Sequence, residues 1–334
     1  MVSAATITKG FVGYIQLIIP IPSMLAILLV LFSLGALAAW GITESVLVAA
    51  LITILEILGL LLVVWVGRYA LPTLPDQLPE MLAGVRLGDA SGVMVGAFLA
   101  FFAFIGFEDM VNVAEEVKKP RRTLPLAILL ALAISTVLYL CVAVTAMLVV
   151  SPQELAASDA PLALIYTRAT GRSATLLSIL GAMAVVNGAL IQIIMATRLL
   201  YGMGRKRWLP TGLAYIHPRR RTPVIATAFV VCVIALLALL MPLVALASTT
   251  SLILLIVFAL INLALLRVKR RSANVVGAPS YPAWVPLLGF ITCVVMVSFS
   301  AFFDPYRPHF LRHIARRPQR TMKWGRQVKF RPRR

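Results

Sequence analysis

A carboxylate that follows an apolar run is the first feature of this sequence that could do chemistry. The apolar run Gly92–Phe107 holds 16 residues and is followed directly by Glu108, in the stretch FFAFIGFEDMVNVAEEVKKPRRTLP. A helix needs about 20 apolar residues to cross a bilayer, so this run is too short. Two interpretations stay open. Either a short helix ends at Phe107 and is followed by a solvated charged segment, or a helix is broken near Gly106 and its freed backbone groups face a ligand.

Other polar residues lie inside apolar runs, where they are costly and often functional. Glu56 lies in the middle of VAALITILEILGLLLVV, with no cation in its own helix. It could carry a proton or be a protonated structural carboxyl. Asn187 and Gln192 share the run Ala174–Met203, and an interhelical hydrogen bond explains them as well as a substrate contact does. The hydroxyl groups of residues 248–251 favour bonds to their own helix backbone or to a neighbouring helix.

The sequence contains no pattern typical of catalysis or of a metal site. HExxH, a paired-Asp motif, a nucleophile with a nearby base and a Gly-rich phosphate loop are all missing. No histidine lies in an apolar run, and the three cysteines, Cys141, Cys232 and Cys293, are interpreted as buried apolar side chains. We therefore expect no enzymatic activity, no metal and no cofactor.

The elements that position these polar residues must be helices in a membrane. The chain of 334 residues is 61% hydrophobic and 13% charged, with a mean hydropathy of +0.96. Soluble domains are about half apolar and a quarter charged. Continuous apolarity favours helices over the alternating strands of a barrel. We predict an all-α polytopic membrane protein with about eight transmembrane helices, at Met24–Trp40, Val46–Val66, Gly92–Phe107, Leu124–Val150, Ala174–Met203, Pro223–Leu240, Leu243–Leu266 and Pro282–Phe302.

Lysine and arginine set the expected orientation of these helices. Loops 110–123, 204–222 and 267–280 hold 14 of them, whereas the alternate loops hold only four. Cytoplasmic loops carry the excess of basic residues, so the three basic loops are predicted to be cytoplasmic. The first 23 residues and loop 151–173 are then expected on the external side.

The C-terminal segment differs from the rest of the chain. Residues 303–334 hold 11 of the 31 Lys and Arg and one acid, without a periodic apolar face. Such a segment could bind nucleic acid or anionic lipid. Its composition favours a disordered tail instead, and we expect no nucleic-acid partner. The predicted domains are a transmembrane domain, residues 1–302, and a basic tail, residues 303–334.

Three stretches also resemble a known family. FFAFIGFEDMVNVAEEVKKPRRTLPLAI resembles the sixth-to-seventh-helix signature of the amino acid–polyamine–organocation (APC) superfamily of permeases. MATRLLYGMGRKRWLPTGLAYIHPRRRTPVIA, residues 195–226, is similar to the eighth-to-ninth-helix segment of that family, and WGITESVLVAALITILEILGLLLVVWVG, residues 40–67, resembles its helices four and five. Together the matches cover most of residues 7–300.

The resemblance implies a leucine-transporter-like fold of inverted repeats, with the substrate between broken helices one and six. The eight runs would be helices four to eleven. Helices one, two, most of three and twelve would be missing, so the resemblance implies a permease truncated at its N-terminus. It also implies site residues in two roles. Phe102, Ala103, Phe104, Ile105, Gly106, Asn187 and Gln192 would bind substrate, Phe102 as a lid, while Glu108 would be a gating or proton-coupling carboxylate.

The function implied by the resemblance is secondary active transport of an amino acid or a related amine by alternating access, with proton coupling or exchange. Glu56 is a second candidate for the proton-coupling role. The expected partners are the substrate and the lipid bilayer, with a homo-oligomer left open, and the expected location is the cell membrane. The alternative is a non-transporting fragment or a structural membrane subunit, because half of the implied site would lie in the missing helices.

Overall fold

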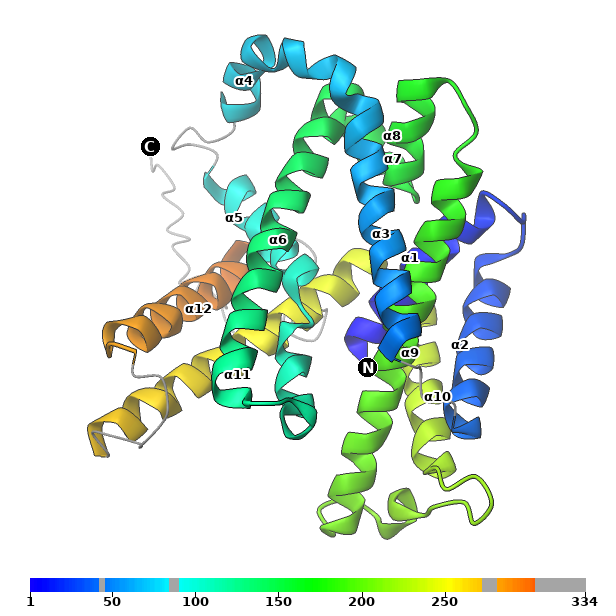
Figure 1. Ribbon diagram of the computed structural model, residues 1–334, viewed down its shortest axis with the longest axis vertical. Coiled ribbons are helices and arrows are strands. Elements are labelled where there is room, and N and C mark those ends of the chain that lie inside the picture. The colour runs from blue at the N-terminus through cyan, green and yellow to red at the C-terminus, as the bar shows by residue number, and fades with distance from the viewer. Residues whose placement is uncertain (42–45, 84–89, 272–280, 304–334) are drawn as a thin grey trace, which may run out of the picture.

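The computed structural model describes residues 1–41, 46–83, 90–271 and 281–303. These residues form helices, with no strand among them (Figure 1). The helices are α1 (Val2–Gln16), α2 (Ser23–Trp40), α3 (Val46–Gly67), η1 (Arg68–Thr73), α4 (Leu74–Ala83), α5 (Ala90–Phe101), η2 (Phe102–Phe104), η3 (Phe107–Glu116), α6 (Pro120–Val149), α7 (Pro152–Ala157), α8 (Pro161–Thr170), α9 (Thr175–Arg205), η4 (Thr211–Ala214), α10 (Val224–Leu240), α11 (Leu243–Arg271) and α12 (Trp284–Phe303).

The predicted all-α membrane architecture is confirmed. Seven of the eight predicted runs each correspond to one helix, and the run Gly92–Phe107 is divided among α5, η2 and the start of η3. Among the described residues, five helices are long and apolar enough to cross a membrane, and three shorter apolar helices account for the remaining runs. Helix α6 shows why lipid must surround the molecule, because none of its most apolar window is buried by protein. Leu129 and Leu140 on this helix are each 60% exposed.

The N-terminal residues do not form the external segment that we expected. Helix α1 packs against α2, α9, α10 and α11, and the chain begins in the middle of the molecule (Figure 1). Its hydroxyl groups lower its hydropathy, yet the Thr6 and Thr8 hydroxyls donate to carbonyls one turn earlier in the same helix. Ala4 and Ala5 are wholly buried. Small side chains permit this close approach of helices, which composition alone does not reveal.

Several connections between helices lie at opposite ends of the molecule. Helices α4, α7 and α8 lie at one end, and the connection from α9 to α10 lies at the other (Figure 1). The C-terminal end of α1 reaches the α8 end, because Gly13 lies directly against the backbone of Asp159. The basic loop 204–222 therefore lies opposite loop 151–173, as the charge asymmetry requires. The orientation in the membrane stays a prediction, and the predicted tail beyond Phe303 lies outside the described residues.

Surface labelling tests this orientation. In a chain whose three cysteines are replaced by serine, we expect an impermeant thiol reagent applied from outside to modify Ala157→Cys but not Thr211→Cys. Both positions are exposed, so accessibility alone does not separate them. Permeabilised cells provide the control, because both positions should then react. The opposite pattern in intact cells would reverse the orientation.

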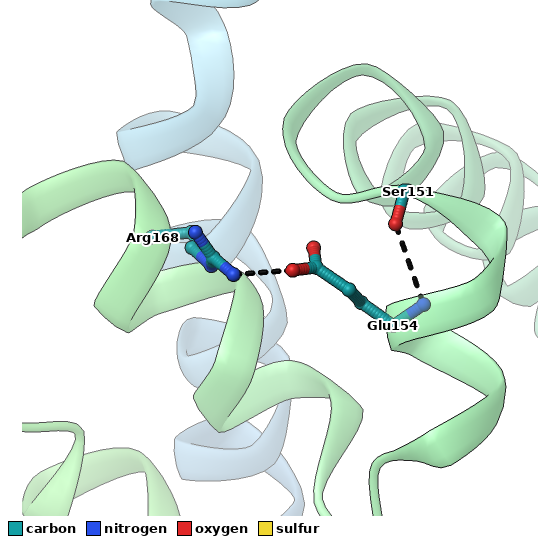
Figure 2. A network of polar contacts seen from close by, with 3 residues as sticks. All are labelled: Ser151, Glu154 and Arg168. Carbon is teal, nitrogen blue, oxygen red and sulfur yellow. Dashed lines mark hydrogen bonds and ion pairs between the residues drawn. The ribbon is translucent and has the colours of Figure 1, made fainter.

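The α7–α8 pair is positioned by packing rather than by charge. The Ser151 hydroxyl accepts a hydrogen bond from the Glu154 backbone N–H at 3.4 Å and caps α7, and the Glu154 carboxylate pairs with Arg168 of α8 (Figure 2). The two charged side chains are 44% and 54% exposed, so this pair contributes only about 0–1 kcal/mol. Ala163 and Ile165 of α8 are almost fully buried in one cluster with Val63 of α3. This apolar contact fixes α8 over the end of the bundle.

Candidate functional site

The helix that begins at Ala90 is broken near the end of the apolar run Gly92–Phe107. Helix α5 ends at Phe101 and continues as a single 3-10 turn, η2. Ile105 is then extended, with φ −66° and ψ 135°, and Gly106 adopts φ 130° and ψ −22° before η3 begins at Phe107. This geometry shows a break at Ile105 and Gly106, so α5 does not continue to Phe107. That freed backbone groups face a ligand stays a prediction. Only glycine adopts such a positive φ readily.

The break frees backbone groups, and part of the surrounding structure satisfies them. The Gly106 N–H donates to Glu108 Oε2 at 2.8 Å, so the carboxylate caps the amide that the break exposes. The Ile105 N–H donates to the Phe102 carbonyl at 3.2 Å. The Tyr139 hydroxyl of α6 donates to the Ala103 carbonyl at 2.8 Å. Unpaired backbone groups are costly inside a membrane, so these bonds make the break stable.

Aromatic contacts hold the break between α6 and α11. Phe258 of α11 contacts Phe101 before the break, with ring centroids 6.1 Å apart, and Phe107 after it, with centroids 5.6 Å apart. Phe104 packs against the Tyr139 ring of α6 at 5.2 Å in an edge-to-face arrangement. Such pairs favour one relative orientation of the rings. The two halves of the broken helix are thereby fixed against neighbouring helices.

A cavity of about 270 Å³ lies against the break. Four elements contribute to it, namely the break with η3, α9, α11 and the start of α1. Its walls combine polar and apolar side chains, and the residues that line it are Met1, Val2, Ser3, Ile105, Glu108, Gln192, Thr250, Ile253 and Leu254. A pocket with an apolar wall and a few convergent polar groups is the usual form of a small-molecule site.

The structure brings together three of the predicted site residues, Ile105, Glu108 and Gln192. Phe102, Ala103, Phe104 and Gly106 lie in the break but do not line the cavity. The carbonyls of Phe102 and Ala103 already accept hydrogen bonds from the protein. We therefore assign the backbone of residues 102–104 to holding the break, while the side chains of Ile105 and Glu108 face the cavity.

Asn187 and Glu56 lie elsewhere. The Asn187 side chain of α9 lies beside Glu56 of α3 and is only 7% exposed. Asn187 Oδ1 and Glu56 Oε1 have no hydrogen-bond partner among the described residues. It lines a second, mostly apolar cavity that includes Phe11 and Ile52, away from Gln192. Residues five positions apart on an α-helix point about 140° apart, so Asn187 and Gln192 cannot face one small cavity. Of the two interpretations of Asn187, its position favours the interhelical contact.

Sequence reasoning missed the contribution of α11. Thr250, Ile253 and Leu254 line the cavity, and the hydroxyl patch at 248–251 was the signal that could have found them. The expected bonds to the helix backbone are present for the two threonines, because Thr249 donates to the Ala245 carbonyl and Thr250 to the Leu246 carbonyl. Among the described residues, the buried hydroxyls of Ser248 and Ser251 have no hydrogen-bond partner. The start of α1 was missed because the hydroxyl groups of this helix lower its hydropathy, which led us to expect it on the external side.

The sequence profile of a family described as amino acid permease matches residues 1–312. The chain belongs to the amino acid permease family. This is a family of integral membrane transporters, and membership agrees with the APC resemblance and with the apolar helices of Figure 1. The broken α5 and the helices around it are thus elements of a permease.

Relatives whose names describe permeases or transporters support the same conclusion. A branched-chain amino acid permease of Bacillus subtilis is 30% identical over 263 residues, which cover 77% of this chain and 55% of the relative. An uncharacterized transporter of Mycobacterium tuberculosis is 32% identical over 61% of this chain and 46% of its own length. Cationic amino acid transporter 3 of Arabidopsis thaliana, a mitochondrial protein by its name, is 29% identical over 59% of this chain and 32% of its own length. The chain spans about half the length of its bacterial relatives.

Proposed function

We propose that the cavity beside the break binds an amino acid and that the chain serves in its secondary transport across the cell membrane. One observation carries the proposal: a carboxylate, a carboxamide and a hydroxyl, from Glu108, Gln192 and Thr250, converge on one cavity at a break in a membrane helix. Permeases expose such breaks to the charged groups of their substrates. The proposal does not include a homo-oligomer, which the sequence left open.

The side chains around the cavity favour an aliphatic amino acid. Glu108 supplies a negative charge for the substrate ammonium group, and Gln192 supplies a donor and an acceptor. Ile105, Ile253 and Leu254 form an apolar wall that suits a branched hydrocarbon side chain. Among the residues that line the cavity, Glu108 is the one acid, which leaves no second carboxylate for a cationic side chain. The name of the Bacillus subtilis relative, a branched-chain amino acid permease, agrees with this choice.

Coupling to protons is assigned to Glu108 first and to Glu56 second. Glu108 both lines the cavity and holds the Gly106 N–H, so its protonation state acts on the substrate and on the break together. Glu56 is paired with Asn187 between α3 and α9, away from that cavity. Alternating access then consists of movement of the two helix halves about Ile105 and Gly106.

Binding of leucine to the purified chain tests the proposal. We expect saturable leucine binding, weaker lysine binding, and a Gln192→Ala variant with an affinity about three- to tenfold lower, since one net hydrogen bond is worth about 0.5–1.5 kcal/mol. Gln153→Ala is the matched control, because Gln153 is exposed on α7 and lies outside the cavity. Equal affinities of the two variants would remove Gln192 from the site.

Leucine uptake into liposomes that contain the chain separates the proposal from its alternative. Saturable uptake supports a transporter. Leucine binding without uptake supports the alternative, a non-transporting fragment or structural subunit. Uptake that exceeds that of empty liposomes but does not saturate indicates leak and counts against the transport proposal.

A further inference from the structure

Another polar cavity, of about 340 Å³, is lined by the end of α2, residues 194–198 of α9, the connection from α9 to α10 and the start of α10. That connection lies at the end of the molecule opposite α7 and α8 (Figure 1). Arg198 comes from α9, and Arg220 and Arg221 come from the connection to α10. The proposed transport function, which uses the cavity at the helix break, gives these three arginines no role.

The positive charge in this cavity is not balanced by protein. No Asp or Glu is among the residues that line it. Among the side chains that the structure describes, Arg198, Arg220 and Arg221 form no ion pair with an Asp or Glu. The Arg220 guanidinium lies 5.3 Å from the centroid of the Trp40 ring, an interaction that leaves its charge in place. Three cations around one cavity favour an anionic ligand.

One of the residues that line the cavity carries a buried hydroxyl without a partner. Thr197 lines it and is only 4% exposed, and its Oγ1 has no hydrogen-bond partner among the described residues. Other helix threonines in this chain, such as Thr6 and Thr227, donate to a carbonyl four residues earlier. A buried hydroxyl without a partner costs free energy that an acceptor supplied by a ligand recovers.

The turn that carries two of the arginines is rigid and strained. Arg221 adopts φ 54°, which is uncommon for a residue other than glycine. Its N–H donates to the His217 carbonyl at 2.8 Å, and the His217 N–H donates to the Thr222 carbonyl at 2.9 Å. The Thr222 hydroxyl donates to the Ala39 carbonyl at 2.6 Å, which ties the turn to α2. Strain that a structure holds in place in this way is typical of ligand-binding sites.

We propose that this cavity binds a phosphate group. The arginines supply charge-assisted donors, the Thr197 hydroxyl supplies a buried one, and the N-terminus of α10 adds the positive end of a helix dipole. The cavity lies at the basic end of the molecule, which the positive-inside rule places at the cytoplasm, where anionic phospholipids are abundant. Trp40, 67% exposed at the end of α2, is typical of the membrane interface. The phosphate belongs either to a phospholipid head group or to a soluble molecule.

Lipid binding to the purified chain in phosphatidylcholine nanodiscs tests the proposal. We expect phosphatidic acid to bind with measurable affinity, and Arg198→Gln and Arg221→Gln each to weaken it about tenfold, since each removes a charge-assisted hydrogen bond. Arg219→Gln is the matched control, because Arg219 lies in the same turn and loses the same charge but does not line the cavity. Thr197→Val, which keeps the side-chain shape, should weaken binding about threefold.

Two results would overturn the proposal. One is equal weakening by Arg219→Gln and Arg198→Gln, which indicates non-specific attraction of a basic surface. The other is no phosphatidic acid binding by a wild-type chain that shows a cooperative thermal transition. Inorganic phosphate, added to the same nanodiscs, distinguishes the sources. Competition at millimolar concentration supports a soluble phosphate, and phosphatidic acid binding without competition supports a lipid head group. Leucine affinity should be unchanged in Arg198→Gln, which keeps this test separate from that of the transport cavity.

Discussion

Gly106→Ala is expected to lower leucine affinity by about ten- to a hundredfold. The geometry that binds leucine requires a backbone conformation at this position that costs alanine about 1–3 kcal/mol. The φ of 130° at Gly106 is one that L-residues rarely adopt. A Cβ added at this position would meet no atom within 4 Å, so the cost is conformational and not a steric clash. The chain can relieve it only by moving the break, which displaces Ile105 and Glu108 from the cavity.

Gly96→Ala provides the matched control for this prediction. Gly96 lies inside α5, and an added Cβ there also meets no atom within 4 Å. Alanine is favoured over glycine in a helix by about 1 kcal/mol, so this variant should keep its affinity and unfold at an equal or higher temperature. Leucine binding and thermal unfolding are measured for both variants in the same detergent. Native affinity in Gly106→Ala would show that the break does not shape the site.

The broken helix was one of two interpretations that the residues left open, and the signal for it is local. A run too short to span, a glycine and a following carboxylate are all visible in the sequence, and Gly106 and Glu108 form the capping contact themselves. Helix α1 could not be placed in this way. Its Thr6, Thr8 and Lys9 reduce its hydropathy, and only the structure shows that Lys9 donates to the Met241 carbonyl and that the threonines are satisfied within the helix.

The composition of the site depends on packing that a sequence does not contain. The separation of Asn187 from Gln192 follows from helical periodicity, and it could have been foreseen. The pairing of Asn187 with Glu56 could not, because it requires knowledge of which faces α3 and α9 present to each other. Thr250 reaches the break only because Phe258, on the same helix, packs against Phe101 and Phe107. Such contacts between distant segments decide which polar residues meet.

Glu108→Gln is expected to weaken leucine binding and to remove the dependence of leucine uptake on a proton gradient. In the wild-type chain the carboxylate lines the cavity and accepts the Gly106 N–H at 2.8 Å. Its negative charge attracts the substrate ammonium group. Glutamine is neutral, and its amide oxygen can accept the same hydrogen bond. The variant should therefore fold normally and bind leucine more weakly.

Two further variants show whether the charge or the capping bond is responsible. Glu108→Ala removes the acceptor as well as the charge, and a partly buried amide left unpaired costs about 1 kcal/mol, so this variant should also unfold at a lower temperature. Glu154→Gln removes an exposed carboxylate of α7 and should leave leucine affinity and uptake unchanged. Leucine affinity and uptake driven by a proton gradient are measured for each variant, per amount of folded protein. Proton-driven uptake by Glu108→Gln that equals the wild type would exclude Glu108 from proton coupling, and the role would pass to Glu56.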